Sequence, residues 1–358
     1  MAYTTIDDPT IYMNNILWTG NSGTQSITGL GFKPNWVWAK VRADNNVTGE
    51  TDHMIADSVR GTTKFVHANN TDIEETNANT FTSFDSDGFS LGNKAELNSN
   101  SNTYVAWCWQ VNDTTVTNST GNISATVSVN DTAGISIISY TGNGSNAQTI
   151  GHSLSATPKV YMIRARTYSS GGGWQMFHGD FGAGGRFQLN TNEGFDTSST
   201  TFGNTAPTSS VLSVGANSST DSSTNKVGES FIGYVFRPVK GFSKFGTYKS
   251  NNSTDGTFIY LGFKPSFFLL KFNTNGENWR IFDNKRSSSG FNPTDKSLSP
   301  NSNGVDENTG QSVDFLSNGV KLRTTSGEIN PSAGSTFIFW AFAESPFVNS
   351  NGVPTNAR

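Results

Sequence analysis

The most informative segment of the sequence is Leu30-Gly31-Phe32-Lys33-Pro34-Asn35-Trp36-Val37-Trp38-Ala39-Lys40, in which a turn with glycine and proline leads into an apolar run. Trp18-Thr19-Gly20-Asn21 precedes it. The same two-part pattern returns twice, at intervals of about one hundred residues, which is too long for a solenoid repeat and suits a β-sandwich. The later copies are Tyr140-Thr141-Gly142-Asn143 with Leu154-Ser155-Ala156-Thr157-Pro158, and Tyr248-Lys249-Ser250-Asn251 with Leu261-Gly262-Phe263-Lys264-Pro265. The pattern therefore predicts three related units.

Each copy also ends alike, on an aromatic run at residues 104–109, 231–236 and 337–342. A hairpin signal lies between the opening and the end of each copy. It consists of apolar residues on both sides of Asp87-Gly88, Glu193-Gly194 or Asn318-Gly319. Asp-Gly and Asn-Gly favour tight β-turns because both central residues of a type I′ turn need a positive φ. We therefore expect a hairpin at residues 84–91, 189–195 and 315–322.

The composition agrees with a β-rich protein. Only 15% of the 358 residues are charged, and Ser, Thr, Asn and Gly take their place. These residues are poor in helix interiors because their side chains compete for backbone hydrogen bonds or, for Gly, because the backbone is too free. Aromatic residues make up 12% of the chain, which argues against disorder. The expected fold is all-β, with three tandem β-sandwich modules of the jelly-roll type and no long helix.

The repeats set the expected domain boundaries. They are an N-terminal arm at 1–15, module one at 16–112, a segment at 113–134, module two at 135–240, module three at 241–346 and a C-terminal tail at 347–358. The segment at 113–134 is either a linker or an extra pair of strands. The length favours several domains, so a single compact core is not expected. The tail is expected to pack along a module or a neighbour.

Charge and hydropathy exclude several classes of protein. The net charge of −4 gives no basic footprint, so a nucleic-acid partner is not expected. No window approaches 18 apolar residues, and the first residues lack the features of a signal peptide, so we expect neither membrane insertion nor secretion by the usual route. The lone Cys108 precludes an internal disulfide, and its apolar surroundings predict a small core residue.

Metal and cofactor sites are not predicted. The four histidines are scattered without the paired spacing of a zinc site. Asp85-Ser86-Asp87-Gly88 resembles the opening of a calcium loop and puts Glu96 at the twelfth place, but Phe89 occupies a ligand position and Ser90 the place that needs Gly. A turn is therefore the preferred interpretation, with calcium as the alternative.

No catalytic residues are predicted, and we expect a protein that is not an enzyme. The carboxylates Glu50, Asp52 and Asp57, or Glu277 and Asp283, are the candidates for acid and base chemistry. Neither group has equivalents in all three modules, so solvated surface acids are the preferred interpretation. No G-x-S-x-G elbow and no phosphate-binding loop occur, and Gly171-Gly172-Gly173 is followed by no helical pattern.

Trp174 and Trp279 are the candidate ligand-binding residues. Each follows a glycine-containing loop and begins a short apolar run, and an indole combines a large apolar face with a polar group. The two runs align with Met54-Ile55 of the first module if Asp52 takes the place of the tryptophan. A position in the core is nevertheless the preferred interpretation for both, with ligand binding as the alternative.

Several segments resemble a family of repeat-containing virion proteins from marine and other bacteriophages, which includes tail-fibre and other structural proteins. The resemblance covers nearly the whole chain. It implies concanavalin A-like sandwich modules and a place on the phage particle, and it brings no catalytic residues. The segments that carry it are Asp57-Ser58-Val59-Arg60-Gly61, Ser83-Phe84-Asp85-Ser86-Asp87-Gly88-Phe89, Tyr104-Val105-Ala106-Trp107-Cys108-Trp109, Asp283-Asn284-Lys285-Arg286 and Ala341-Phe342-Ala343-Glu344-Ser345-Pro346-Phe347.

The expected function is therefore that of a tail-fibre or tail-associated appendage that contacts the host surface, with a glycan as ligand and other virion proteins as partners. The alternative is a capsid decoration or head-fibre protein, and a polysaccharide-degrading enzyme is the weakest hypothesis. Exposed edge strands must be covered, so we expect a homo-oligomer, most simply a trimer. The arm before the first repeat is either an anchor to the particle or an added edge strand.

Overall fold

The computed structural model describes residues 3–45, 49, 51–168, 173–197, 200–216, 224–274, 276–308 and 310–356. Within this part of the chain, helix is confined to α1 (Ala95–Asn98) and the 3-10 turn η1 (Pro9–Ile11). The remaining elements are strands, so the prediction of an all-β fold is confirmed. The assignment to the jelly-roll, concanavalin A-like type stays a prediction. None of the described helices has the length and apolarity needed to cross a membrane.

The first unit consists of two antiparallel sheets. The large sheet has the order β1-β9-β3-β4-β5-β6 and the small sheet the order β2-β8-β7. A cluster of buried side chains, including Val37, Phe65, Phe89 and Tyr104, lies in this unit. The strands are β1 (Met13–Thr19), β2 (Gln25–Thr28), β3 (Trp36–Ala43), β4 (Met54–Asp57), β5 (Lys64–His67), β6 (Glu75–Thr76), β7 (Phe81–Asp85), β8 (Gly88–Leu91) and β9 (Thr103–Trp109).

The second unit repeats this plan with an extended large sheet. Its large sheet has the order β10-β11-β12-β18-β14-β15-β16, and its small sheet pairs β13 with β17. Because β10 and β11 lie within residues 113–134, this segment is an extra pair of strands rather than a linker. The strands are β10 (Val116–Asn118), β11 (Ala125–Asn130), β12 (Ile135–Thr141), β13 (Gln148–Gly151), β14 (Val160–Ala165), β15 (Gln175–His178), β16 (Phe187–Gln188), β17 (Val211–Val214) and β18 (Ser230–Phe236).

The third unit has sheets of the orders β19-β25-β21-β22 and β20-β24-β23. Its Pro265 lies inside β21, where the register with β25 shifts on both sides of it. A bulge is a place where a strand tolerates proline, because no regular ladder bond is lost there. The strands are β19 (Ser243–Lys249), β20 (Phe258–Tyr260), β21 (Phe263–Phe272), β22 (Arg280–Asp283), β23 (Val313–Leu316), β24 (Gly319–Leu322) and β25 (Thr336–Pro346).

Two of the three predicted hairpins are confirmed. β7 pairs with β8 around Asp87-Gly88, and β23 pairs with β24 around Asn318-Gly319. The hairpin at residues 189–195 is wrong, because these residues form no strand. Gly194 serves another purpose there. A Cβ on it would lie 2.5 Å from the carbonyl oxygen of Asn273 in the third unit, so the glycine allows the two units to approach.

The large sheets are buried on both faces. Alternate residues of a strand point to opposite faces of its sheet. In β3, Val37 and Ala39 belong to the cluster inside the first unit, whereas Trp36 and Trp38 belong to a separate cluster that contains residues of all three units. The second and third units have inner clusters of their own as well.

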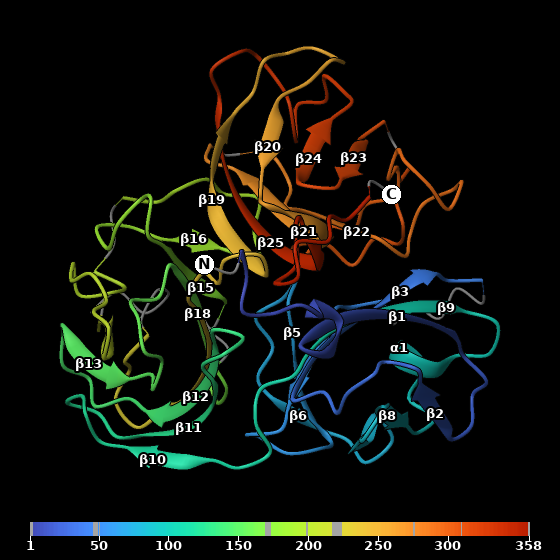
Figure 1. Ribbon diagram of the computed structural model, residues 1–358. Coiled ribbons are helices and arrows are strands. Elements are labelled where there is room, and N and C mark those ends of the chain that lie inside the picture. Colours follow the sequence, from blue (N-terminus) through green and yellow to red (C-terminus); the bar gives the residue numbers. More distant parts are fainter. Residues whose placement is uncertain are drawn as a thin grey trace.

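The three units meet in this shared cluster, which we call the central core. Figure 1 shows the first unit in blue to teal, the second in green and the third in orange to red around a common centre. Trp36 stacks on Trp109 with ring centroids 4.0 Å apart and on Tyr234 of the second unit at 4.5 Å. Trp109 meets Phe342 of the third unit at 5.5 Å. Each unit thus keeps an inner core of its own, as expected, and the three units also share the central core, because each large sheet has a second apolar face to bury.

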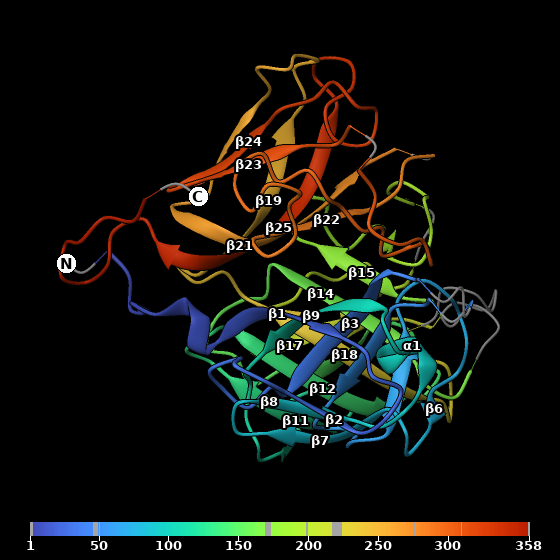
Figure 2. The same cartoon turned by 90° about the vertical axis from the view of Figure 1, so that its right-hand side faces the viewer.

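Both ends of the described chain pack against the third unit and lie on the same side of the molecule (Figure 2). Strand β1 begins at Met13, so residues 13–15 belong to an edge strand of the first unit and not to the arm. The arm itself is held by bonds from Thr4 Oγ1 to the Lys240 carbonyl and from Tyr3 Oη to the Gly262 carbonyl, of 3.0 and 2.9 Å. The tail packs along the third unit, where the Phe347 amide donates to the same carbonyl.

We expect the chain to unfold in one cooperative transition, because no unit can keep its large sheet buried without the other two. Scanning calorimetry tests this through the ratio of the calorimetric to the van't Hoff enthalpy, which should be near one. Substitution Trp36→Ala should lower the midpoint of the whole transition and cost about 3–5 kcal/mol. Three resolved transitions, of which only one responds to Trp36→Ala, would contradict a shared core.

Candidate functional site

Trp174 and Trp279 lie in the central core and are fully buried. Each indole donates across a seam between units, Trp174 Nε1 to the His67 carbonyl and Trp279 Nε1 to the Gln188 carbonyl, both at 3.0 Å. Neither side chain reaches the surface, so the preferred interpretation of both as core residues is confirmed and their candidate role in ligand binding is corrected. The strand register also corrects the alignment, because His53 and not Asp52 takes the equivalent place in the first unit.

His53 makes the matching contact in the first unit. Its Nε2 lies 3.1 Å from the Ser299 carbonyl of the third unit, while its Nδ1 accepts from Trp38 Nε1. The first unit thus contacts the third, the second contacts the first and the third contacts the second. The three contacts therefore link the three units of a single chain in a closed ring, with one contact at each seam.

A second ring consists of buried cations at equivalent positions of β3, β14 and β21. Lys40 donates to the Asn303 carbonyl at 3.2 Å, Arg164 to the Asn70 carbonyl at 2.8 Å and Lys271 to the Asn192 carbonyl at 3.3 Å. Each acceptor again belongs to the neighbouring unit. Burial lowers the pKa of Lys40 to about 7 and that of Lys271 to about 8, because the charged form loses its hydration. These side chains donate hydrogen bonds to backbone carbonyls across the seams and so stabilise the contacts between units.

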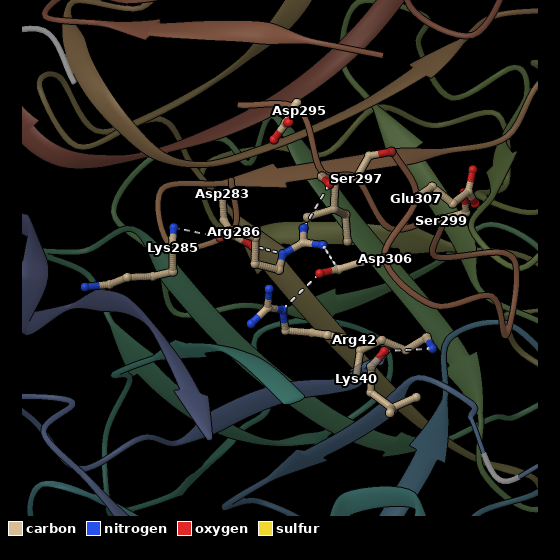
Figure 3. A network of polar contacts seen from close by, with 12 residues as sticks. Lys40, Arg42, Asp283, Lys285, Arg286, Asp295, Ser297, Ser299, Asp306 and Glu307 are labelled. Carbon is tan, nitrogen blue, oxygen red and sulfur yellow. Dashed lines mark hydrogen bonds and ion pairs between the residues drawn. The ribbon is translucent and has the colours of Figure 1, made fainter. Parts of the chain in front are cut away.

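The seam between the first and third units contains a network of three ion pairs (Figure 3). Asp283 and Arg286 are fully buried and form an ion pair of 2.6 Å. Arg286 also contacts Asp306 at 2.7 Å, and Asp306 contacts Arg42 of the first unit at 3.0 Å. Trp107 Nε1 donates to Asp283 from the first unit at 2.9 Å. Burial alone would raise the pKa of Asp283, but Arg286 and the bond from Trp107 lower it.

The same arrangement occurs between the first and second units. Asp57 pairs with Arg60, both fully buried, and Tyr234 Oη of the second unit donates to Asp57 at 2.7 Å. The prediction that Asp57 and Asp283 are solvated surface acids is therefore wrong. Their shared spacing to an arginine three residues later was a sequence signal for a paired, buried carboxylate.

The third seam lacks the ion pair. The positions of the aspartate and the arginine are occupied in the second unit by His178 and Phe181. The equivalent of Trp107 is Trp340, and neither Trp340 Nε1 nor His178 Nε2 has a hydrogen-bond partner among the described residues. Burial lowers the pKa of His178 to about 4, so this imidazole is neutral at physiological pH. The three-fold pattern is thus complete at two seams only.

Among the described residues, neither candidate group of carboxylates contains an accessible acid and base pair. Asp57 and Asp283 are held by arginines away from solvent, so neither carboxylate is accessible to a substrate at the surface. Asp52 accepts amide bonds from Asn69 and Asn70, and Glu277 is half-buried. Glu50 and the glycines at 171 and 172 lie outside the described residues.

Asp52, His67 and Glu96 are the residues best placed to hold a metal ion in the described part of the chain. One possible ligand atom of each lies within 4.8 Å of the others. However, His67 Nε2 contacts Glu96 Oε1 at 3.1 Å, and Lys94 Nζ contacts Glu96 Oε2 at 3.1 Å. Burial would raise the pKa of Glu96, but these two neighbours lower it. A cation would have to displace the lysine, so an ion-pair cluster is the simpler interpretation.

The calcium-loop alternative is not supported by the turn at residues 85–88. Asp87 accepts bonds from the amides of Gly29 and Gly31, of 2.9 and 2.7 Å, and Asp85 accepts one from Ser90 Oγ. Glu96, the expected twelfth ligand, contacts His67 instead. The carboxylates therefore fix the turn against the loop before β3, as the preferred interpretation expects.

Exposed aromatic side chains and a surface hollow lie on the third unit. Phe258 and Tyr260 of β20 are 43% and 50% exposed. Beside them a hollow of about 440 Å³ is lined by Tyr3, Lys240, Lys244 and Tyr260, among others. These residues were not predicted from the sequence. A signal was present, because residues 258 and 260 are aromatic where the equivalent strand positions of the first unit hold Ser26 and Thr28. This hollow is the candidate binding site.

Substitution Asp283→Asn is expected to reduce the free energy of unfolding by about 3–5 kcal/mol, because it leaves Arg286 buried without its carboxylate. Asp57→Asn should have a similar effect. The matched control is Asp113→Asn, which removes an exposed pair with Lys33 and should cost at most about 1 kcal/mol. Urea titration measures all three. Equal losses for Asp283→Asn and Asp113→Asn would show that the buried pair has no special role.

The buried lysines predict that stability rises with pH just above neutrality. Their pKa values are lower in the folded than in the unfolded chain, so unfolding takes up protons between the two values. Between pH 7 and 8.5 the free energy of unfolding should increase by roughly 1 kcal/mol per pH unit for Lys40. The variant Lys40→Met should lose this increase. A variant with an unchanged pH profile would mean that Lys40 keeps its ordinary pKa.

The comparisons with known proteins address the chain as a whole. The family model described as "Domain of unknown function (DUF7483)" matches residues 8–346. No curated protein matches the chain at a significant level. The matched range begins in the arm, ends with the last residue of β25 and includes all three units, in agreement with the shared central core. The chain therefore belongs to the DUF7483 family.

Proposed function

We propose that this chain is a non-enzymatic bacteriophage virion protein, a tail-fibre or tail-associated appendage whose outer surface contacts a glycan on the host. The observation that carries this proposal is the contrast between interior and surface. The buried carboxylates of two seams are occupied in ion pairs that help to hold the units together, while β20 of the third unit presents aromatic side chains beside a hollow.

The buried chemistry supports a role without catalysis. Catalytic carboxylates need access to a substrate and protonation states that can change during the reaction. Asp57 and Asp283 have no such access, because each is enclosed with an arginine. In this proposal the three-unit framework is structural, and its outer surface makes the functional contacts.

The resemblance to phage virion proteins supports the location on a particle. The segments that carry it include Asp57-Ser58-Val59-Arg60-Gly61 and Asp283-Asn284-Lys285-Arg286, whose ion pairs form two of the seams. Other segments of the resemblance are strands β9 and β25 of the large sheets. The resemblance thus concerns the framework, and contact with the host falls to the outer surface.

The expected homotrimer is part of the same proposal in a modified form. A trimer is expected as a way to cover edge strands, whereas the central core covers the second faces of the large sheets within one chain. Three-fold assembly of chains would therefore use the outer surfaces or a partner in the virion. Light scattering of the purified chain measures its oligomeric state directly.

Labelled, purified chain is expected to bind host cells in a saturable manner and to compete with adsorption of the intact phage. The matched measurement is binding to phage particles that lack the protein. Binding to particles without binding to cells would favour the decoration or head-fibre role and would overturn host contact. Release of sugars from purified host polysaccharide would instead revive the enzyme hypothesis.

A further inference from the structure

The outward face of β20 distinguishes the third unit from the first. Residues 258 and 260 flank the inward-facing Ile259, as Ser26 and Thr28 flank Ile27 in β2. Both pairs are exposed, but only the third unit has aromatic side chains there. Exposed aromatic residues grouped beside a hollow commonly mark a binding surface.

The hollow next to β20 is large enough for a small ligand. It measures about 440 Å³, and a neighbouring hollow of about 650 Å³ shares Tyr3, Pro238 and Lys240 with it. Volumes of this size are typical of ligand sites. The two hollows lie side by side between the arm, the turn before β19 and the end of β20.

Tyr3 is held in place at the rim of both hollows. Its hydroxyl donates to the Gly262 carbonyl at 2.9 Å and lies 3.3 Å from the hydroxyl of Tyr260. Gly262 has a φ of +83°, and a Cβ there would lie 2.8 Å from the Tyr3 hydroxyl, so glycine permits this approach. Burial, followed by the contact with Tyr260, raises the pKa of Tyr3 to about 12. Tyr3 therefore presents a neutral phenol at physiological pH.

Two lysines supply positive charge at the same place. Lys240 Nζ lies 4.7 Å from the ring centroid of Tyr3, and Lys244 Nζ lies 5.3 Å from that of Tyr260. Lys244 also donates to the Tyr260 carbonyl at 2.7 Å. Among the described residues neither lysine forms an ion pair, and the residues lining the smaller hollow include no carboxylate.

We propose that this surface binds an anionic sugar chain. The sugar rings would pack their C–H faces on Phe258 and Tyr260, while Lys240 and Lys244 would contact the carboxylate or sulfate groups of the chain. An ammonium group is a compact charge suited to such acidic groups. The inference deepens the proposed function and rests on it only for the biological source of the sugar.

A single-stranded nucleic acid also combines stacking with negative charge, but it fits the observations less well. Its binding proteins use a basic groove that follows the backbone over several nucleotides. Here the positive charge is limited to two lysines on an acidic chain, with Arg237 already paired with Asp131. The observations therefore favour the sugar chain.

The test uses the full-length chain and isothermal titration calorimetry with three probes. These are oligogalacturonate with carboxylate groups, a dextran sulfate fragment with sulfate groups, and neutral dextran. We expect saturable binding of at least one anionic probe, weaker binding on addition of salt, and no binding of neutral dextran. The anionic probe that binds identifies the acidic group.

Two double variants locate the site. Phe258→Ala with Tyr260→Ala, and Lys240→Gln with Lys244→Gln, should each weaken binding about tenfold or more. The matched control is Ser26→Ala with Thr28→Ala at the equivalent strand positions of the first unit, which should leave binding unchanged. All variants change exposed or half-buried side chains, and an unchanged calorimetric unfolding midpoint shows that each is folded.

Several results would overturn the inference. They are no saturable binding of either anionic probe by the folded chain, equal binding of neutral dextran, unchanged affinity in both double variants, or displacement of the probe by single-stranded DNA at lower concentration. Failure of the proposed function looks different. In that case anionic sugars bind at β20, but the labelled chain does not bind host cells. If instead the chain binds host cells and both double variants still bind them, only the role of the β20 surface is rejected.

Discussion

The large sheet of each unit is apolar on both of its faces, and the architecture follows from this constraint. One face packs inside its own unit, while the other carries indole and phenyl rings such as Trp36, Trp109 and Phe342. If these rings stayed in water, the folded state would lose about 1.5–3 kcal/mol of hydrophobic stabilisation for each large apolar side chain. Because each unit has the same need, the three second faces cover one another, and three sandwiches become one body.

Polar groups fix how the units meet in that body. Apolar faces alone could slide or rotate, whereas buried hydrogen bonds and ion pairs have few acceptable geometries. Backbone bonds cross the same three seams, with the donor and acceptor units exchanged relative to the side-chain bonds. The amides of Asp306, Glu74 and Phe195 donate to the carbonyls of Arg42, Arg166 and Asn273, at 2.8, 2.7 and 2.9 Å. The seam at His178 lacks the ion pair and keeps the backbone bond, so the geometry tolerates the loss of one pair.

The division between framework and surface also shapes the functional argument. A residue in a seam is constrained by two units at once, so a change there affects folding before it affects binding. The outward positions of the small sheets are free of that constraint. Serine and threonine in β2 and aromatic residues in β20 occupy equivalent places with the same backbone pairing. A single unit can therefore acquire a binding surface while the framework stays unchanged.

The sequence alone determined the β class, the three units and two of the three hairpins, because periodic apolar runs and Asp-Gly or Asn-Gly turns act through local geometry. It also placed Cys108 in the core, where burial raises the pKa of its thiol. The central core, the burial of Asp57 and Asp283 and the role of Trp174 and Trp279 were decided by the tertiary structure. Each of these depends on which unit faces which, and contacts between residues 91 to 177 positions apart leave no periodic signal. The double-faced strands were visible as unbroken apolar runs, but only the packing of the units shows what covers their second face.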